Sequence, residues 1–575
     1  MRHRTLGSLF PAGLALAVLM ATTSGVPRVF RPTEPNGAPP TLRAPRMVTE
    51  TSRDQHLRFG LNLAVRQRAL DAYLSRLYDP SSSTYRRFID AKTFGTRFGL
   101  SSEALSLVTQ RLRDAGFAVR SFPQHTSLDV EGTVGQVEDF FDTRIANFVD
   151  VSGDRFHAPL ADPVIPEDLK ASVAAVTGLS SRARSKPADI PADGLKPTDL
   201  ATAYNIKPLW DLGYTGEGQT VAIFSQFTFD DSDMAGFDQT FNTQGPAPEH
   251  IAVNGGTTEK DLEVNLDIDT VRAVAPKAQM LVYEIPDFPG GEPQSYAEFE
   301  SAFAQGVATV VNQVVADHRA QILSISYGTC DVPDAGGAAW LPAADRLAGE
   351  TALKAAAAAG INVFVSAGDG AAYTCQHWLP KDLRVTAAWP GDSPWVISVG
   401  GTYLRVRQDA SYLDEAGWGN PLSRWGTGGG LNPQDARPSW QQGPGVANAA
   451  SNGRRQFPDV AAAGDSGSGY QVFFQGRLHR VGGTSGSAPF WAGVMALVQQ
   501  TAANQGIKKL GFASPMLYDL AANPPSEAPF HDVTKGSNLY YSCTAGWDYA
   551  TGLGSPDAFN LARAAVTYLK SHPPQ

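Results

Sequence analysis

Residues 361–370 read INVFVSAGDG, an apolar run that ends in small residues and a glycine turn. β-branched and aromatic residues bounded by glycine are typical of a buried strand. Similar runs recur at 220–224, 280–285, 322–326 and 395–399, and alanine-rich helical stretches lie between several of them. This alternation predicts an α/β domain whose parallel sheet is covered by helices on both faces. In such a sheet, functional residues gather at the carboxyl ends of the strands.

The composition excludes several classes of protein. The chain has 575 residues, of which 42% are hydrophobic and 18% charged. The length allows more than one domain, and the low charged fraction argues against a disordered acidic tail or a basic nucleic-acid binder. The 3 cysteines are too few for a disulfide scaffold and do not form a zinc framework. The net charge of −10 is uneven, because residues 1–189 carry +5 and residues 190–575 carry −15.

The start of the chain has the pattern of a secretory signal peptide. Arg2 and Arg4 precede an apolar stretch at about residues 6–20, and small residues follow, so we expect cleavage near Gly25. The stretch is shorter than the roughly 20 residues that span a bilayer, which favours a signal over a membrane anchor.

The remaining chain divides into four parts. Residues 26–53 have the composition of a linker, and residues 180–197 that of an exposed linker. The part between them, 54–179, is predicted to be a compact α+β unit with helices at 63–77 and 103–115 and strands at 118–122 and 127–130. The α/β domain occupies 198–575.

Residues 482–489 read GGTSGSAP and place Ser485 among small residues before an apolar helical pattern at 490–498. A serine there would lie near the positive end of a helix dipole, with room for a substrate carbonyl. A plain glycine turn with a helix cap has the same pattern. A nucleophilic serine needs a base, and none of the ten histidines has a catalytic context; His479 is predicted to be a strand-surface residue. The base should therefore be another group.

Residues 259–275 supply a pair of carboxylates. They read EKDLEVNLDIDTVRAVA and predict a helix that is capped by Thr257 or Thr258. Glu263 and Asp267 are four residues apart and share one face. If partly buried, they would share a proton and one pKa would rise sharply, which gives a base suited to acidic medium. A solvated acidic helix face is the alternative.

Asp369 follows the predicted strand at 361–365 and is a third candidate carboxyl. It is either an ordinary turn aspartate before glycine or a neutral carboxylic acid that donates a hydrogen bond to an oxyanion. The second role again requires low pH.

Together these motifs resemble those of the sedolisin family, the serine-carboxyl peptidases. The serine motif is Gly483-Thr484-Ser485 with Pro489 four residues beyond the serine, the Glu-x-x-x-Asp helix is residues 263–267, and the oxyanion aspartate is Asp369. The resemblance implies a subtilisin-like catalytic domain at 198–575, with an α+β ferredoxin-like activation prodomain at 54–179 before it. Residues 79–87, 132–134 and 140–143 resemble that prodomain, and 198–206 resemble the opening of a mature enzyme. Processing is then expected in 180–197.

The resemblance also implies a function. Ser485 would be the nucleophile, Glu263 the general base, Asp267 its orienting partner and Asp369 the oxyanion stabiliser. The expected protein is a secreted (extracellular or periplasmic), self-processing, acid-acting serine-type endopeptidase and a monomer. Its partners would be polypeptide substrates and its own prodomain, which acts as intramolecular inhibitor and chaperone, with no nucleic acid and no membrane after signal cleavage. A tripeptidyl aminopeptidase and an inactive secreted binding protein are the alternatives; a histidine-dependent subtilisin lacks its histidine.

A structural Ca²⁺ ion is implied as cofactor. Its ligands would be the carboxylates of Asp532 and Asp548 and the main-chain carbonyls of Val533, Thr544 and Gly546. Hard oxygen donors suit this ion, and a pair of solvated loop aspartates is the alternative.

The chain also departs from the family pattern. Tyr327 stands where some members have Trp, and Asp331 where Glu is usual, which affects the expected subsite preference. Cys330 and Cys375 are expected to form a disulfide in an oxidising compartment, which leaves Cys543 unpaired.

The uneven net charge of the two parts of the chain follows the division into prodomain and enzyme that the resemblance implies. Without residues 1–25 the front part still has 22 basic and 19 acidic residues, against −15 for the remainder. Attraction between the parts is expected to hold the precursor together at neutral pH, and acid would weaken it.

Overall fold

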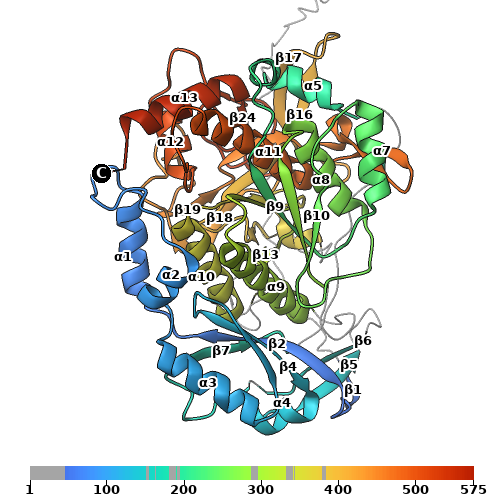
Figure 1. The fold of residues 1–575 in the computed structure, drawn as a ribbon. Helices are drawn as coiled ribbons and strands as arrows, with labels where there is room; N and C mark the ends of the chain where they lie inside the picture. Colours follow the sequence, from blue (N-terminus) through green and yellow to red (C-terminus); the bar gives the residue numbers. More distant parts are fainter. Residues whose placement is uncertain are drawn as a thin grey trace, which may run out of the picture.

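The computed structural model describes residues 46–149, 155–161, 163–179, 189–190, 194–286, 296–331, 341, 343–377 and 384–574. The expected signal peptide lies outside these residues, as does most of the expected processing linker. Figure 1 shows two parts in contact, a smaller front unit (residues 46–179) and a larger α/β domain. Within the described ranges, no helix is long and apolar enough to cross a membrane.

The α/β domain is organised around an eight-stranded sheet of order β10-β11-β9-β12-β14-β16-β17, in which β20 also pairs with β16. Its strands are β9 (Thr220–Ser225), β10 (Glu249–Ala252), β11 (Gln279–Glu284), β12 (Ile322–Ile325), β14 (Asn362–Ser366), β16 (Ile397–Val406), β17 (Tyr412–Gly417) and β20 (Val460–Ala463). All pairs are parallel except β16 with β17. The predicted parallel sheet is confirmed, with one antiparallel edge strand.

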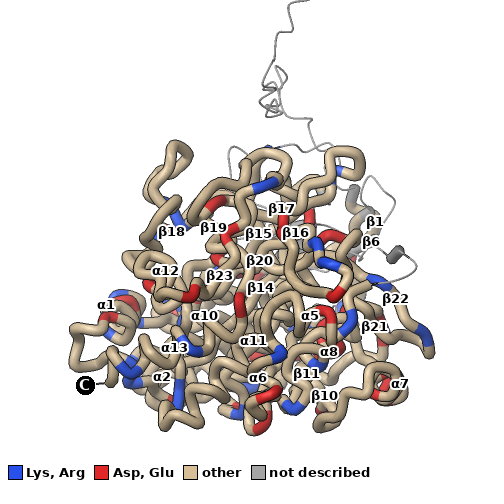
Figure 2. Tube along the Cα trace, turned by 90° about the horizontal axis from the view of Figure 1, so that it is seen from above, with Lys and Arg blue, Asp and Glu red and all other residues tan. Residues whose placement is uncertain are grey.

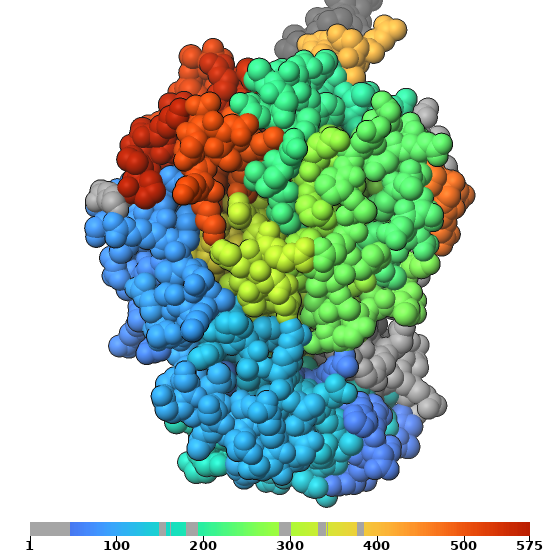
Figure 3. All heavy atoms as spheres, viewed as in Figure 1, coloured from blue at the N-terminus to red at the C-terminus, as the bar shows by residue number. Residues whose placement is uncertain are grey.

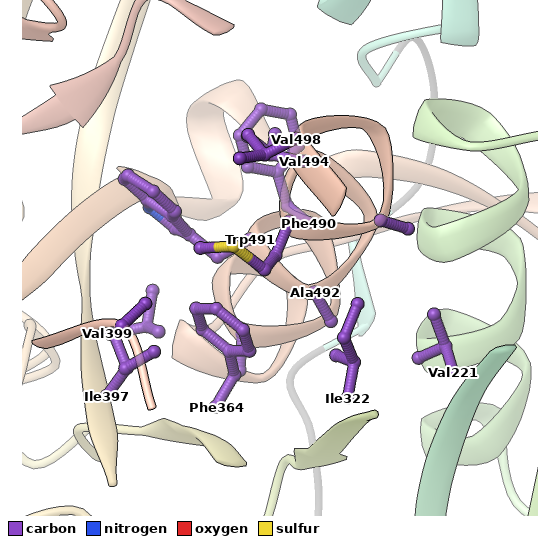
Figure 4. Packing of buried hydrophobic residues seen from close by; sticks show 14 of the residues in the cluster. Val221, Ile322, Phe364, Ile397, Val399, Phe490, Trp491, Ala492, Val494 and Val498 are labelled. Atoms are coloured by element: carbon purple, nitrogen blue, oxygen red, sulfur yellow. The ribbon is translucent and has the colours of Figure 1, made fainter. Parts of the chain in front are cut away.

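Helices cover both faces of this sheet, because successive strand residues point to opposite sides. Ala222 and Phe224 pack with α9 (Tyr296–Asp317) and α10 (Ala343–Ala359). The other face packs with α8 (Leu262–Val274) and α11 (Thr484–Ala503), and α13 (Ala558–Ser571) packs on α11. In Figure 4, Phe490, Trp491 and Ala492 of α11 lie over Ile322, Phe364 and Ile397 of three adjacent strands. This apolar contact fixes the first turn of α11, which carries Ser485.

Smaller elements surround the sheet. The helices are α5 (Pro197–Ala203), α6 (Lys207–Asp211), α7 (Asp231–Phe241) and α12 (Ser514–Ala522), with 3-10 turns at Thr374–His377 and Ser466–Ser468. The strand pairs are β13 (Thr329–Asp331) with β15 (Ala387–Trp389), β18 (Gly430–Ala436) with β19 (Arg454–Phe457), and β23 (Phe530–His531) with β24 (Ser555–Pro556). A three-stranded sheet joins β21 (Tyr470–Phe474), β22 (Arg477–Val481) and β8 (Asp189–Ile190).

The front unit has a βαββαβ order, the ferredoxin-like arrangement. Its core elements are β2 (His56–Leu63), α3 (Ser102–Asp114), β3 (Ala118–Ser121), β4 (Ser127–Thr133), α4 (Val134–Phe141) and β7 (Val173–Thr177), and the antiparallel sheet has the order β3-β4-β2-β7. Helices α1 (Gln67–Leu77) and α2 (Ala91–Phe98) are inserted after β2. A second sheet joins β1 (Arg46–Glu50), β5 (Ile145–Val149) and β6 (Arg155–Pro159).

Three local predictions differ from the structure. Strand β1 lies in the segment 26–53 that was expected to be a linker, and it pairs with β5 of the front unit. The helix predicted from residue 63 begins at Gln67, because Leu63 ends strand β2. His479 does lie on strand β22, but it is buried, where its ring bonds the carbonyl of Phe474.

The front unit packs on α9 and α10 of the α/β domain, and Figure 3 shows the two surfaces in contact. The contacts are mainly neutral: Gln124 donates to the carbonyl of Asn312 over 2.8 Å, and Tyr78 donates to that of Ala357. One ion pair crosses the described interface, from Lys354 of α10 to Asp71 over 2.7 Å. The basic residue of this pair lies in the acidic α/β domain and its acidic residue in the front unit, which is the reverse of what the net charges would favour. Figure 2, which views the molecule from above, shows basic and acidic residues interspersed along the chain.

Candidate active site

Ser485 is the second residue of α11, and the glycine turn before it is a geometric requirement. Gly483 has φ +134°, and a Cβ there would lie 2.8 Å from Oδ2 of Asp369. Only glycine tolerates both the backbone conformation and the close approach. The turn therefore holds the Asp369 carboxyl against the start of the helix that carries Ser485.

Pro489 changes the hydrogen bonding of the same turn. It lies inside α11 and has no N–H, so it cannot donate to the carbonyl of Ser485 four residues earlier. That carbonyl instead accepts from the hydroxyl of Ser326 over 3.0 Å. The hydroxyl of Ser485 is 3.2 Å from the carbonyl of Ser326.

Glu263 and Asp267 lie on α8, whose start differs from the prediction. The helix begins at Leu262, and its N-cap is Asp261, whose carboxylate accepts from the main chain of Glu263 over 3.1 Å. The predicted caps, Thr257 and Thr258, are wrong because the helix begins at Leu262, three residues after the predicted start at 259. Every residue from Glu263 to Val274 is buried, which rules out a solvated acidic face.

Burial controls the protonation of this pair. Burial raises the pKa of Glu263 well above its usual value, the neighbouring charge of Asp267 raises it further, and a hydrogen bond with the Ser485 side chain opposes both. Burial also raises the pKa of Asp267, against a hydrogen bond from Ser326. Within the described structure, Oε1 of Glu263 and Oδ2 of Asp267 have no hydrogen-bond partner. A proton shared between the two carboxyls satisfies both.

Asp369 is anchored to the nucleophile's helix rather than to its own turn. Its Oδ1 accepts from both the N–H and the hydroxyl of Thr484, each over 2.8 Å. The Thr484 hydroxyl in turn accepts from the N–H of Gly368 over 3.1 Å. These contacts place the carboxyl beside Ser485, as the oxyanion role requires, and they disfavour the ordinary turn aspartate.

The structure adds residues that sequence reasoning did not assign. The sequence marked Thr484 only as part of the serine motif and Ser326 only as the end of a predicted strand. Tyr327, which the sequence linked only to subsite preference, is half-buried with its ring against Phe224, and the pKa of its phenol is raised by burial and by the charges of Glu263 and Asp267. The position of Ser326 and Tyr327 directly after strand β12 was the available signal.

The cysteine predictions are confirmed. Cys330 and Cys375 form a disulfide that joins β13 to the 3-10 turn at Thr374–His377. Cys543 is free and buried.

The expected calcium ligands lie on two segments that contact each other. The N–H of Gly546 donates to Asp532 over 3.0 Å, and the N–H of Thr544 donates to Asp548 over 3.0 Å. In the described parts of the chain no three His, Cys, Asp or Glu side chains are grouped to hold a metal ion. The expected set has only two carboxylates and otherwise uses main-chain carbonyls. An all-oxygen set of this kind fits a hard cation.

Two stretches of the chain match the models of known protein families. Residues 46–182 match the model of the pro-kumamolisin activation domain, and residues 250–515 match that of the subtilase family. The sedolisin of Pseudomonas sp. (strain 101) is 28% identical over 525 residues, covering 86% of this chain and 83% of that protein. The solved structure of Pseudomonas sedolisin, a serine-carboxyl proteinase in complex with pseudo-iodotyrostatin, superimposes with a TM-score of 0.52 at 27% identity, covering 66% of this chain and 99% of the other.

The chain belongs to the sedolisin family. It is therefore a serine-carboxyl peptidase with an activation prodomain, which is the front unit, and the subtilisin-like fold is confirmed.

Of two further relatives, one is named for a specific activity, that of a tripeptidyl-peptidase. Kumamolisin of Bacillus sp. (strain MN-32) is 29% identical over 470 residues, covering 76% of this chain and 78% of that protein. Tripeptidyl-peptidase sed4 of Aspergillus fumigatus is 25% identical over 575 residues, covering 87% and 90%. Membership of the sedolisin family is thus compatible with more than one mode of cleavage.

Proposed function

We propose that this sedolisin-family chain is an acid-acting endopeptidase that is secreted as a self-processing zymogen. One observation carries the proposal: the buried carboxyl pair and Asp369 meet at the start of the helix that carries Ser485, the pair through Ser326 and Asp369 through Thr484. A histidine base is not needed in this arrangement, because the buried pair retains a proton and provides a carboxylate.

The reaction follows from these positions. Oγ of Ser485 attacks the scissile carbonyl, and Glu263 takes its proton and returns it to the leaving amine. Asp267 holds the proton that the pair shares and orients Glu263. Asp369, when protonated, donates a hydrogen bond to the oxyanion together with the N–H of Ser485. Ionisation of these groups as the pH rises removes the shared proton and the oxyanion donor, so activity should fall toward neutral pH.

The test is cleavage of a denatured protein substrate in acidic and in neutral buffer. We expect activity in acid, little at neutral pH, and none in Ser485→Ala at either. Equal wild-type activity in both buffers would contradict the mechanism.

A tripeptidyl-peptidase is the second candidate, supported by the similarity to sed4. Such an enzyme needs a free substrate N-terminus, whereas an endopeptidase cleaves internal bonds. A peptide assayed with a free and with an acetylated N-terminus separates the two, because acetylation abolishes only tripeptide release.

The proposal of secretion draws on the pattern of residues 1–25 and on the disulfide between Cys330 and Cys375, which favours an oxidising compartment. Self-processing draws on the prodomain packed against the peptidase domain. N-terminal sequencing of secreted material before and after acid treatment tests both. Loss of the front unit should require Ser485.

We also propose one structural Ca²⁺ ion, held by the carboxylates of Asp532 and Asp548 and the carbonyls of Val533, Thr544 and Gly546. When bound, the ion would cross-link the two loop segments. The test is the melting temperature of the Ser485→Ala precursor with added Ca²⁺ and with chelator. A melting temperature that Ca²⁺ raises in this protein but not in an Asp532→Asn version supports the site, and no response in either overturns it.

A further inference from the structure

Ser326 connects the two halves of the proposed active site. Its hydroxyl contacts Oδ1 of Asp267, which belongs to the buried pair. The same hydroxyl is 3.0 Å from the carbonyl of Ser485, and its own carbonyl is 3.2 Å from the Ser485 hydroxyl. Ser326 therefore meets the nucleophile through its main chain and through its side chain.

The hydroxyl of Ser326 has two acceptors and a single proton. If Asp267 is ionised, the charged oxygen is the stronger acceptor, and the hydroxyl donates to it. If the pair holds its shared proton on Oδ2 of Asp267, Oδ1 is an uncharged oxygen and a weaker acceptor, so the proton of the Ser326 hydroxyl turns to the carbonyl of Ser485. The orientation of this hydroxyl depends on the protonation of Asp267.

Because of Pro489, the orientation in which the Ser326 hydroxyl donates to the carbonyl of Ser485 has a structural effect. In an unbroken helix the N–H at position 489 would satisfy the carbonyl of Ser485, but proline has none. The carbonyl therefore depends on Ser326, and a buried carbonyl without a donor is costly. Protonation of Asp267 thus supplies a hydrogen bond to the backbone of the nucleophile.

We infer that Ser326 is a positioning residue that couples the protonation of Asp267 to the backbone of Ser485, and so sets part of the acid dependence of the enzyme. The inference rests on the proposed function, since it concerns the pH profile of that reaction. The other titratable groups that act on Glu263 or on Tyr327 at this site are Asp261 on the N-cap of α8 and Asp369 after β14.

Removal of the Ser326 hydroxyl should move the pH profile of activity upward. The bond from Ser326 favours the charged form of Asp267, so its removal raises the pKa of that carboxyl further. The pair then keeps its proton to higher pH. In Ser326→Ala the fall of activity toward neutral pH should move upward by about one pH unit. The rate constant kcat should fall about ten- to a hundredfold because the Ser485 carbonyl loses its donor, with little change in KM.

The matched control is Ser324, two residues earlier on strand β12. Its hydroxyl is also buried but has no hydrogen-bond partner in the described structure. Ser324→Ala should leave kcat and the pH profile unchanged, and Ser326→Thr, which keeps a hydroxyl, should restore much of the wild-type profile.

A second variant predicts the opposite shift. Pro489→Ala provides an N–H for the carbonyl of Ser485, which leaves the Ser326 hydroxyl to Asp267 alone. The activity should then fall at lower pH than in the wild type. Opposite shifts in Ser326→Ala and Pro489→Ala support the coupling.

The proposed coupling between Asp267 and Ser485 is overturned if the pH profile of activity is the same in Ser326→Ala, Pro489→Ala and Ser324→Ala. If the wild type itself showed no acid-dependent cleavage, the proposed function would fail instead, and the two failures are therefore distinguishable.

Discussion

Around Arg346, four carboxyls of the peptidase domain gather about one guanidinium, whereas the pair beside Ser485 has no cationic partner among the described residues. Arg346 bonds Asp331 over 3.0 Å and Asp435 over 2.6 Å, and Glu350 is 3.8 Å away. The fourth carboxyl is Asp392, which is fully buried and has no hydrogen-bond partner for either oxygen in the described structure. Arg346 and these four carboxyls form the Arg346 cluster, whose residues lie in β13, α10, β18 and the turn after β15.

The contrast separates two uses of buried carboxyls. A guanidinium permanently compensates the charge of the carboxylates that it pairs with, and it binds neighbouring segments together. Hydroxyl donors, such as those around Glu263 and Asp267, compensate less, so the pair retains a proton that can be transferred. We therefore expect changes in the first set to affect stability and changes in the second to affect catalysis.

The largest expected effect is on activity. Glu263→Gln keeps the shape of the side chain but removes the base, so self-processing in acid should slow by about 10²–10⁴-fold. Glu350→Gln is the matched variant, because Glu350 is also a buried carboxyl and its oxygens accept from Trp389 and Ser393. Its rate per folded molecule should stay near that of the wild type. Equal losses of activity in the two variants would contradict the division between catalytic and stabilising carboxyls.

Removal of the Arg346 guanidinium should have the largest effect on stability. Arg346→Met leaves buried carboxyls without a counter-charge, which costs about 3–5 kcal/mol of unfolding free energy at neutral pH. Denaturant unfolding of the Ser485→Ala precursor measures this. Asp331→Asn in the same background should recover part of the loss, and a cost below about 1 kcal/mol would show that the cluster is not held by Arg346.

We expect a smaller, pH-dependent effect on stability from Asp392. Burial and then the charge of Asp331 raise the pKa of Asp392 well above 3.8, and Arg346 opposes them. The folded chain therefore holds a proton that the unfolded chain releases, so stability falls as the pH rises above about 4, by up to about 1.4 kcal/mol per unit. Asp392→Asn should flatten this decline in melting temperature. An unchanged slope would show that Asp392 does not titrate in the folded protein.

Some of this organisation is readable from sequence because it depends on local pattern. Apolar runs at strand spacing gave the sheet, and the motifs around Ser485, Glu263 and Asp369 gave the candidate site. Strand β1 was missed because its partner β5 lies about a hundred residues away and Met47 and Val48 are exposed, so no burial pattern marks it.

Other contacts depend on tertiary structure alone. The cap of α8 was misassigned because Thr257, Thr258 and Asp261 are all good caps, and only the path of the chain selects Asp261. The contacts of Ser326 with Asp267 and Ser485 require three segments to meet, which no single stretch of sequence encodes.

The smallest expected effect concerns the other cation of α10. Lys354 lies eight residues after Arg346, but it faces the prodomain and pairs with Asp71, whose side chain is 54% exposed. An exposed pair contributes roughly 0.2–1 kcal/mol and is screened by salt. Lys354→Met or about 0.5 M salt should therefore change the rate of acid activation of the precursor by less than about fivefold. A much larger acceleration by salt would mean that the contrast in net charge, rather than the neutral contacts of Gln124 and Tyr78, holds the prodomain in place.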